Sequence, residues 1–312
     1  MIPLRINKIQ KPNSIFMVHI DIVHGCQLQC IGCPNSTLMD KVKRVEVDHF
    51  AKILNNIDVD HIHTLRLFNF GEPLLHRQLD KIVAEIPKQK WKASIVELST
   101  NAQFTDWDNF EEMLKLQVIN KIAVSCDGDG SKEKYEELRP PGKMEKLMKF
   151  LEKTKALCDK WSPATELVTR TIVETEQDKT NWLKILTPLG WTPEFRNWMI
   201  LPEAKENPSQ RQVQKTDGKC FFVADPSEFK NHPWHGDINL LYVDYDGTVV
   251  PCCFHPQAGK FGDLSKYKYS DIINSSQRFE FIQTMETDRE NMSICGKCEV
   301  GPVGKEGPSF MG

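Results

Sequence analysis

Up to about residue 200, short strand-like runs of apolar residues alternate with longer segments in which apolar residues recur at helical spacing. Short runs rich in β-branched and apolar residues predict six strands, over 16–23, 64–70, 93–100, 121–127, 165–173 and 193–198. Apolar residues three and four positions apart predict helices between them, over 47–57, 78–89, 107–117, 143–161 and 178–190. This order predicts an α/β fold with a parallel sheet, closed or partly closed into a barrel whose functional groups lie at the C-terminal strand ends.

The pattern changes beyond residue 200. Residues 201–219 are polar, contain two prolines and show no period, which predicts a linker. Alternating apolar positions on both sides of Asp246 and Gly247 then predict a β-hairpin. A helix over 269–286 and a poorly ordered tail rich in Gly and Pro over 301–312 are predicted to follow.

Composition and charge narrow the class of protein. The 312 residues are 40% hydrophobic, enough for one large core and a smaller neighbouring unit. Lysine and arginine number 40 against 43 acidic residues, so no strongly basic surface for nucleic acid or anionic membranes is expected. The first residues lack the pattern of a signal peptide, and no long apolar run follows. We therefore expect a cytoplasmic protein.

The ten cysteines are unevenly placed. Three lie at 26, 30 and 33, four at 252, 253, 295 and 298, and the others at 126, 158 and 220. Because a reducing compartment disfavours structural disulfides, these groups predict metal ligation or catalysis, and two metal centres are the first interpretation.

The first group, Cys26, Cys30 and Cys33, follows the first predicted strand directly. Three thiolates can hold three irons of a four-iron cluster and leave the fourth iron open for chemistry. The alternative is zinc, with His24 or a distant residue as fourth ligand, but zinc loops favour paired C-x2-C units. The spacing thus favours iron over zinc. A non-enzymatic protein with two structural zinc sites is kept as the alternative from a different functional class.

The stretch CQLQCIGC resembles the C-x3-C-x2-C signature of the radical S-adenosylmethionine enzymes. The resemblance implies a partial (β/α)6 TIM-like barrel and a cluster whose open iron binds S-adenosylmethionine. Cleavage of that cofactor to a 5′-deoxyadenosyl radical, which removes hydrogen from carbon, is the implied activity. An external one-electron donor such as flavodoxin or ferredoxin is the implied partner.

Further stretches resemble the cofactor site of that family. NFGEP at 69–73 is similar to its Gly-Gly-Glu motif, with Phe70 in place of the first glycine. The resemblance implies that Asn69, Gly71 and Glu72 bind the methionine ammonium. STN at 99–101 and the stretch over 125–150 also resemble parts of the family's cofactor site. The resemblance implies that Ser99 and Asn101 line this site. It also implies that Ser125 and Arg170 hold the ribose and the methionine carboxylate of the cofactor.

The C-terminal part resembles the SPASM extension in its shortened form, called Twitch, which combines a β-hairpin with a helix. The resemblance implies that Cys220, Cys252, Cys295 and Cys298 hold a second, auxiliary four-iron cluster, and a four-cysteine zinc site is the alternative. It also implies the domain boundaries: a barrel over 1–200, a linker over 201–219, a cluster domain over 220–300 and a tail over 301–312.

Cys253 is left over beside a cluster ligand, and we expect it either to return a hydrogen atom to a substrate radical or to pack beneath the cluster. Cys158 is expected in the core, and Cys126 in the core or the site. Only 25 residues precede Cys26, too few for a domain that binds a peptide leader. We therefore expect a small polar substrate, of sugar, aminocyclitol or sugar-nucleotide type, that is epimerised or dehydrogenated, with ribosomal peptide modification as the alternative. Candidate pocket residues are Trp198, Trp234 and Asp244.

Overall fold

The computed structural model describes residues 11–38, 41–198, 201–204, 220–223 and 240–301. Six parallel strands form the barrel sheet in the order β1, β4, β5, β6, β7 and β8. Their bounds are Ser14–Ile20, His61–Arg66, Lys92–Thr100, Lys121–Ser125, Glu166–Ile172 and Thr192–Arg196. All six predicted strands and their parallel arrangement are confirmed, and the order along the sheet follows the order along the chain.

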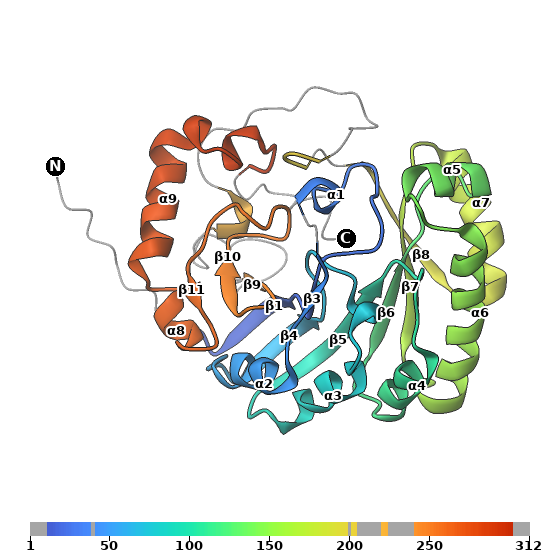
Figure 1. Cartoon of the computed structure of the whole chain (residues 1–312), viewed down its shortest axis with the longest axis horizontal. Coiled ribbons are helices and arrows are strands. Elements are labelled where there is room, and N and C mark those ends of the chain that lie inside the picture. Colours follow the sequence, from blue (N-terminus) through green and yellow to red (C-terminus); the bar gives the residue numbers. More distant parts are fainter. Residues whose placement is uncertain (1–10, 39–40, 199–200, 205–219, 224–239, 302–312) are drawn as a thin grey trace.

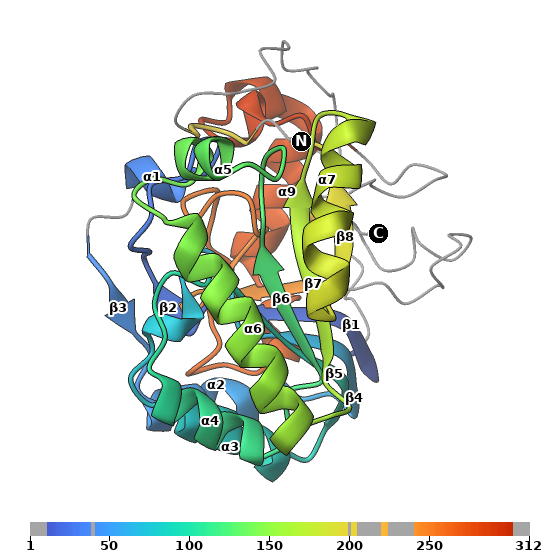
Figure 2. The same ribbon diagram turned by 90° about the vertical axis from the view of Figure 1, so that its right-hand side faces the viewer.

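The predicted helices cover the outer face of this curved sheet (Figures 1 and 2). They are α2 (Val47–Asn55), α3 (Leu79–Ala84), α4 (Trp107–Lys115), α6 (Met144–Trp161) and α7 (Glu176–Leu186). Each presents its apolar positions to the core. Side-chain caps mark the starts of α4 and α7: Asp106 accepts from the Asn109 amide, and Thr175 forms a capping box with Asp178.

Short elements connect the barrel units. They are α1 (Asn35–Leu38), α5 (Lys132–Leu138), the paired strands β2 (Val23–His24) and β3 (Lys43–Arg44), and the 3-10 turns η1 (Pro73–Leu75), η2 (Ile86–Lys88) and η3 (Thr187–Leu189). Helix α5 is absent from the helices predicted above. Its N-terminal cap, Ser131, accepts a hydrogen bond from the Lys134 amide and marks its start.

The predicted hairpin is present, and it extends the barrel sheet. Strands β9 (Leu240–Val243) and β10 (Thr248–Val250) are antiparallel, and Gly247 in the turn has a φ of 89°. Strand β9 also pairs in parallel with β1, and the amide after β1, that of Asp21, donates to the Val243 carbonyl at 2.8 Å. With β11 (Gly262–Asp263), the sheet has nine strands.

The single helix predicted over 269–286 is wrong, because the segment forms two helices beside the hairpin (Figure 1). These are α8 (Tyr269–Ile272) and α9 (Ser276–Asp288). The 3-10 turn η4 (Phe221–Val223) precedes the hairpin in the chain, and the turns η6 (Arg289–Asn291) and η7 (Cys295–Lys297) follow α9. The break falls at Ser275, whose hydroxyl accepts from the Arg278 amide and donates to the Phe261 carbonyl. Its capping chemistry starts a new helix there.

Several expectations lie outside the described residues: most of the linker, at 205–219, the tail beyond residue 301, and Trp234. In the described ranges, no helix combines the length and apolar character needed to cross a membrane.

Candidate active site

A cavity of ≈ 960 Å³ opens at the C-terminal ends of the barrel strands. It brings together the first cysteine group, the implied cofactor residues and the surplus cysteine. These lining residues are Cys26, Cys30, Cys33, Asn69, Gly71, Glu72, Ser99, Asn101, Ser125, Arg170 and Cys253. Trp198 also lines this cavity. Residues predicted from stretches far apart in the sequence therefore share one cavity.

The loop that carries the first cysteine group is held on both sides. Backbone amides of Gln29 and Ile31 donate to the carbonyls of Pro140 and Leu138, at 2.7 and 2.9 Å, so the end of α5 supports the loop. The Asn101 side-chain amide donates to the Cys26 sulfur at 3.2 Å. These hydrogen bonds fix the backbone of the loop and can therefore hold its three thiols in position.

Burial raises the pKa of the Cys26 thiol to about 12, with Glu72 adding to the shift, and that of Cys30 to about 11. These thiols are therefore poorly suited to ionise alone. A cationic metal centre stabilises thiolates, so a donor set of three sulfurs beside an open cavity fits an iron–sulfur cluster with one open iron.

The NFGEP loop packs directly against the start of the cysteine loop. A Cβ at Gly71 would lie 1.5 Å from the Val23 carbonyl oxygen, so only glycine fits this approach. The next amide, that of Glu72, donates to the Gly25 carbonyl at 3.1 Å. Phe70, the departure from the family motif, is buried. The glycine thus places the acidic residue beside the cluster loop.

Glu72 is buried, and its carboxylate joins its own turn to the end of β5. It accepts from the Thr100 hydroxyl at 2.6 Å, the Asn101 amide at 2.7 Å and the Leu74 amide at 3.0 Å. Burial raises its pKa, while these hydrogen bonds oppose the shift. A carboxylate can accept about four hydrogen bonds, so capacity for one further donor remains.

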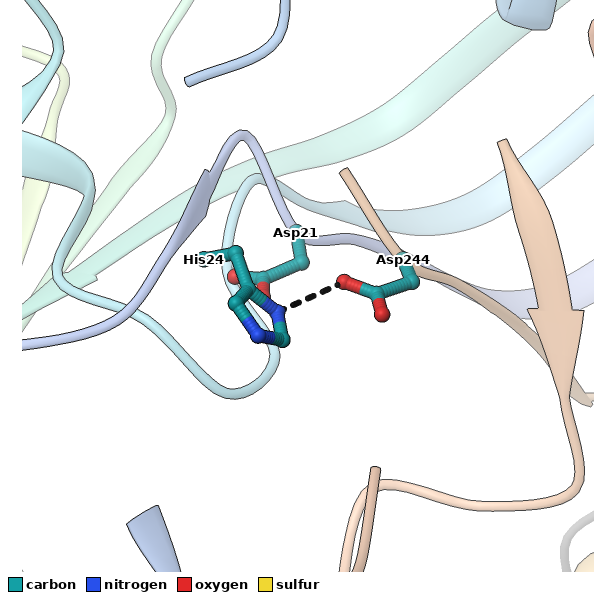
Figure 3. A group of neighbouring side chains, drawn as sticks. All are labelled: Asp21, His24 and Asp244. Carbon is teal, nitrogen blue, oxygen red and sulfur yellow. Dashed lines mark hydrogen bonds and ion pairs between the residues drawn. The ribbon is translucent and has the colours of Figure 1, made fainter. Parts of the chain in front are cut away.

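Asp21, His24 and Asp244 connect the cysteine loop to the hairpin (Figure 3). The Asp21 carboxylate accepts from the amides of Gly71 and Asn69, at 3.0 and 3.3 Å. His24 lies with Nδ1 3.1 Å from the Asp244 carboxylate. Asp244 therefore serves this junction and is not among the residues that line the cavity.

Arg170 and Arg139, two of the arginines that line the cavity, have different ion-pair partners. Arg170, implied to bind the methionine carboxylate, forms ion pairs with Glu97 and Glu194. Arg139, which the motifs did not single out, pairs with Asp127 and lies close enough to Cys30 to oppose the rise in its pKa. The charge of Arg139 likewise opposes the rise in the pKa of Cys26, so this guanidinium acts on two cysteines of the loop.

The auxiliary cysteines converge from three segments of the chain. Cys220, Cys252, Cys295 and Cys298 line one small cavity of ≈ 20 Å³. Burial raises the pKa of each of these thiols, and neighbouring cysteines raise those of Cys220, Cys252 and Cys295 further. Four convergent thiols without a large adjoining space fit a cluster with every iron ligated by protein.

Arg289 holds the C-x2-C segment of this group and was missed from the sequence. Its guanidinium donates to the carbonyls of Cys295, Cys298 and Val300, at 3.2, 3.2 and 2.6 Å. A buried arginine six residues before the first cysteine carries no recognisable motif. The missed Arg139 at least lies in the stretch whose likeness to the family was noted.

The remaining cysteines divide by environment. Cys126 and Cys158 are buried in the core, as expected for small apolar side chains. Cys252 and Cys253, though adjacent, line different cavities: the small one with the auxiliary thiols and the large one with the first group. Burial raises the pKa of Cys253 to about 11, against the opposing effects of Arg66 and a hydrogen bond with Tyr242.

Comparisons with known proteins agree with this geometry. The profile of the radical SAM superfamily matches residues 20–173, and that of the SPASM iron–sulfur cluster-binding domain matches 236–299. A probable GTP 3′,8-cyclase of Methanocella arvoryzae is 29% identical over 116 residues, 36% of this chain. The match spans only 34% of that relative, about a third of its length.

Three solved structures share the fold at low sequence identity. SuiB of Streptococcus suis, bound to S-adenosylmethionine, has a TM-score of 0.65 at 14% identity, covering 93% of this chain and 73% of its own. The anSMEcpe protein with bound AdoMet and a Cp18Cys peptide has 0.58 at 16%, covering 92% and 86%. BtrN in complex with AdoMet and 2-DOIA has 0.52 at 16%, covering 94% and 97%.

The two profile matches confirm the cofactors predicted from the cysteine groups, S-adenosylmethionine and two 4Fe–4S clusters, over the zinc alternative. The parallel partial barrel and its C-terminal extension agree with the solved relatives. The chain therefore contains a radical SAM domain and, C-terminal to it, a SPASM-type iron–sulfur domain.

Proposed function

We propose that this protein uses S-adenosylmethionine to remove a hydrogen atom from a small polar substrate of sugar, aminocyclitol or sugar-nucleotide type, giving epimerisation or dehydrogenation. One observation carries the proposal: the ≈ 960 Å³ cavity is lined both by the first cysteine group and by Cys253, which lies on the segment after β10. Small-molecule sites commonly enclose about 300–1,000 Å³, so cofactor and substrate can share this space.

The chain's own residues position the cofactor. Asn69, Gly71 and Glu72 are assigned to the methionine ammonium, and the capacity of Glu72 for one further donor beside the cysteine loop supports this assignment. Ser99, Asn101 and Ser125, at or just beyond the ends of β5 and β6, are assigned to the same cofactor. For the carboxylate, the placement of Arg139 near Cys30 makes it a stronger candidate than Arg170.

When bound, the first cluster supplies one electron that cleaves S-adenosylmethionine to methionine and a 5′-deoxyadenosyl radical. An external donor such as flavodoxin or ferredoxin would deliver that electron in the cytoplasm. Abstraction of one substrate hydrogen by that radical would give 5′-deoxyadenosine and a substrate radical. Until that step the two proposed reactions are identical, and they differ only in how the substrate radical is quenched.

In epimerisation, the Cys253 thiol gives its hydrogen atom to the opposite face of the substrate carbon. A thiyl radical remains, and one further electron from the donor and one proton restore the thiol. In dehydrogenation, the substrate radical would instead lose one proton to solvent and one electron, for which a cluster held by Cys220, Cys252, Cys295 and Cys298 would be the acceptor, and no hydrogen donor is required. The position of Cys253 on the cavity wall supports the first route.

Modification of a ribosomal peptide is the second candidate. The fold likeness to anSMEcpe, whose structure holds a Cp18Cys peptide, favours it. The likeness to BtrN with 2-DOIA, which covers more of both chains at a lower TM-score, favours a small molecule. Because both likenesses rest on low identity, only substrate turnover distinguishes the two candidates.

The test is a screen of anaerobically reconstituted protein with dithionite, S-adenosylmethionine and matched sets of sugars, aminocyclitols, sugar nucleotides and peptides. We expect one of the first three sets to increase 5′-deoxyadenosine release above the substrate-free rate. Release stimulated only by peptides would support the second candidate. No S-adenosylmethionine cleavage in protein that contains both clusters would contradict both.

A further inference from the structure

Three arginines line the cavity from strands β4, β7 and β8 of the barrel sheet. Arg66 ends β4, Arg170 lies on β7 and Arg196 ends β8. The strand register places Arg66 beside Glu97 of β5, and Arg170 beside Glu194 of β8. These five side chains thus form one charged layer on the sheet face that surrounds the cavity.

The positive charge of this layer exceeds its negative charge. Glu97 is shared by Arg66, at 3.0 Å, and Arg170. Glu194 is shared by Lys121 at 2.5 Å, Arg196 at 3.5 Å and Arg170 at 3.7 Å. Within the described ranges, the arginines thus have ion pairs with only these two carboxylates, one of which is already bonded to a lysine.

The arginines also retain unused hydrogen-bond donors. The Nε atoms of Arg170 and Arg196 are buried and have no hydrogen-bond partner among the described residues. Burial and the charge of Arg170 lower the pKa of Arg196 to about 10, as expected for an incompletely neutralised guanidinium that still remains charged at neutral pH. Since buried donors are normally satisfied, a missing acceptor is indicated.

We propose that Arg66, Arg170 and Arg196 form an oxyanion subsite that binds a phosphate or carboxylate group of the substrate. A guanidinium binds such groups through two parallel hydrogen bonds, which suits recognition better than a single point charge. The Phe68 ring lies 5.9 Å from the Arg66 guanidinium and 5.4 Å from that of Arg170, which helps to fix their orientation.

This subsite rests on the proposed function and specifies its substrate class as anionic. It also gives Arg170 a role distinct from binding the methionine carboxylate, which Arg139 is better placed to perform. Because Cys253 lines the same cavity, an oxyanion held by the arginines anchors one end of the substrate in the space reached by that thiol.

The experiment is anaerobic equilibrium dialysis of the holoenzyme with S-adenosylmethionine, at constant ionic strength, against labelled pyrophosphate or labelled citrate. We expect saturable binding of about one equivalent of at least one probe. Arg66→Gln and Arg196→Gln should each weaken it by about tenfold or more, because each removes charge-assisted hydrogen bonds. Arg77→Gln, which removes an exposed arginine absent from the cavity lining, should leave binding unchanged.

Binding of pyrophosphate alone identifies a phosphate-bearing substrate, and binding of citrate alone identifies a carboxylate. No saturable binding of either probe, or affinities in both glutamine variants within twofold of the parent, would overturn the subsite. Iron content and S-adenosylmethionine affinity, expected to match the parent, control for folding. Dithionite-driven cofactor cleavage is measured separately, so failure of the proposed radical chemistry is distinguishable from failure of anion binding.

Discussion

The two cysteine groups differ in origin and in surroundings. Cys26, Cys30 and Cys33 come from one loop and line a cavity of ≈ 960 Å³. The four auxiliary thiols come from three segments and line a cavity of ≈ 20 Å³. Three ligands beside a large space suit a reactive cluster with an exchangeable position, and four ligands around a small space suit a closed one. The number of thiols and the volume of the adjoining cavity together therefore distinguish the roles of the two cysteine groups.

The largest expected effect follows removal of the open site. Replacing Cys26, Cys30 and Cys33 together by Ala should remove about four irons per chain and abolish S-adenosylmethionine cleavage, because the auxiliary group has separate ligands. Iron analysis and 5′-deoxyadenosine release provide the measurements. Retention of all iron would contradict the assignment.

Removal of the closed site should have a different result. Cys295→Ala with Cys298→Ala should lose the auxiliary cluster and lower the Tm, while the first cluster and its affinity for S-adenosylmethionine persist. Cys158→Ala is the matched control, since this core cysteine belongs to neither group. Loss of cofactor binding in the double variant, with the first cluster still present, would show that the two sites are not independent.

Adjacent cysteines provide the next comparison. Cys253→Ala should abolish epimer formation but preserve cofactor cleavage and the auxiliary cluster, because the thiol is proposed to donate hydrogen without binding iron. Turnover in D₂O is the measurement: the parent should incorporate solvent deuterium into the product. Normal turnover by the variant, with both clusters intact, would support the oxidative route and a packing role for Cys253.

The close approach between the NFGEP and cysteine loops gives a stability prediction. Gly71→Ala should lower the free energy of unfolding by about 1–3 kcal/mol or more, because its Cβ would overlap the Val23 carbonyl. Thermal unfolding of the reconstituted protein measures this effect. Unchanged stability and iron content would mean that the two loops can separate without consequence.

The smallest effect concerns cofactor affinity. Arg139→Gln should weaken S-adenosylmethionine binding by about tenfold, as loss of a charge-assisted hydrogen bond requires, while Arg170→Gln should have a smaller effect. Glu72→Gln should also weaken binding, because the ammonium loses a charged acceptor. Equilibrium binding under anaerobic conditions measures all three variants. A larger loss for Arg170→Gln than for Arg139→Gln would restore the role implied by the family motif.

The sequence was sufficient where the determining contacts are local. The spacing of Cys26, Cys30 and Cys33 predicted the cluster loop. The alternation of strand and helix patterns predicted the barrel, because each of these patterns lies within a short stretch of the chain. The parallel pairing of β9 with β1 was not predictable, because it joins strands more than 200 residues apart. Arg139 and Arg289 were missed because each acts through backbone or electrostatic contacts that only the fold creates.

The most direct test of the central claim is EPR spectroscopy of two variants before and after addition of S-adenosylmethionine. One variant lacks Cys295 and Cys298, so it retains only the open cluster, and the other lacks Cys26, Cys30 and Cys33. The cofactor should change the reduced-cluster spectrum of the first variant and leave that of the second unchanged. A response confined to the second variant would contradict the assignment of the open site to the first cysteine group.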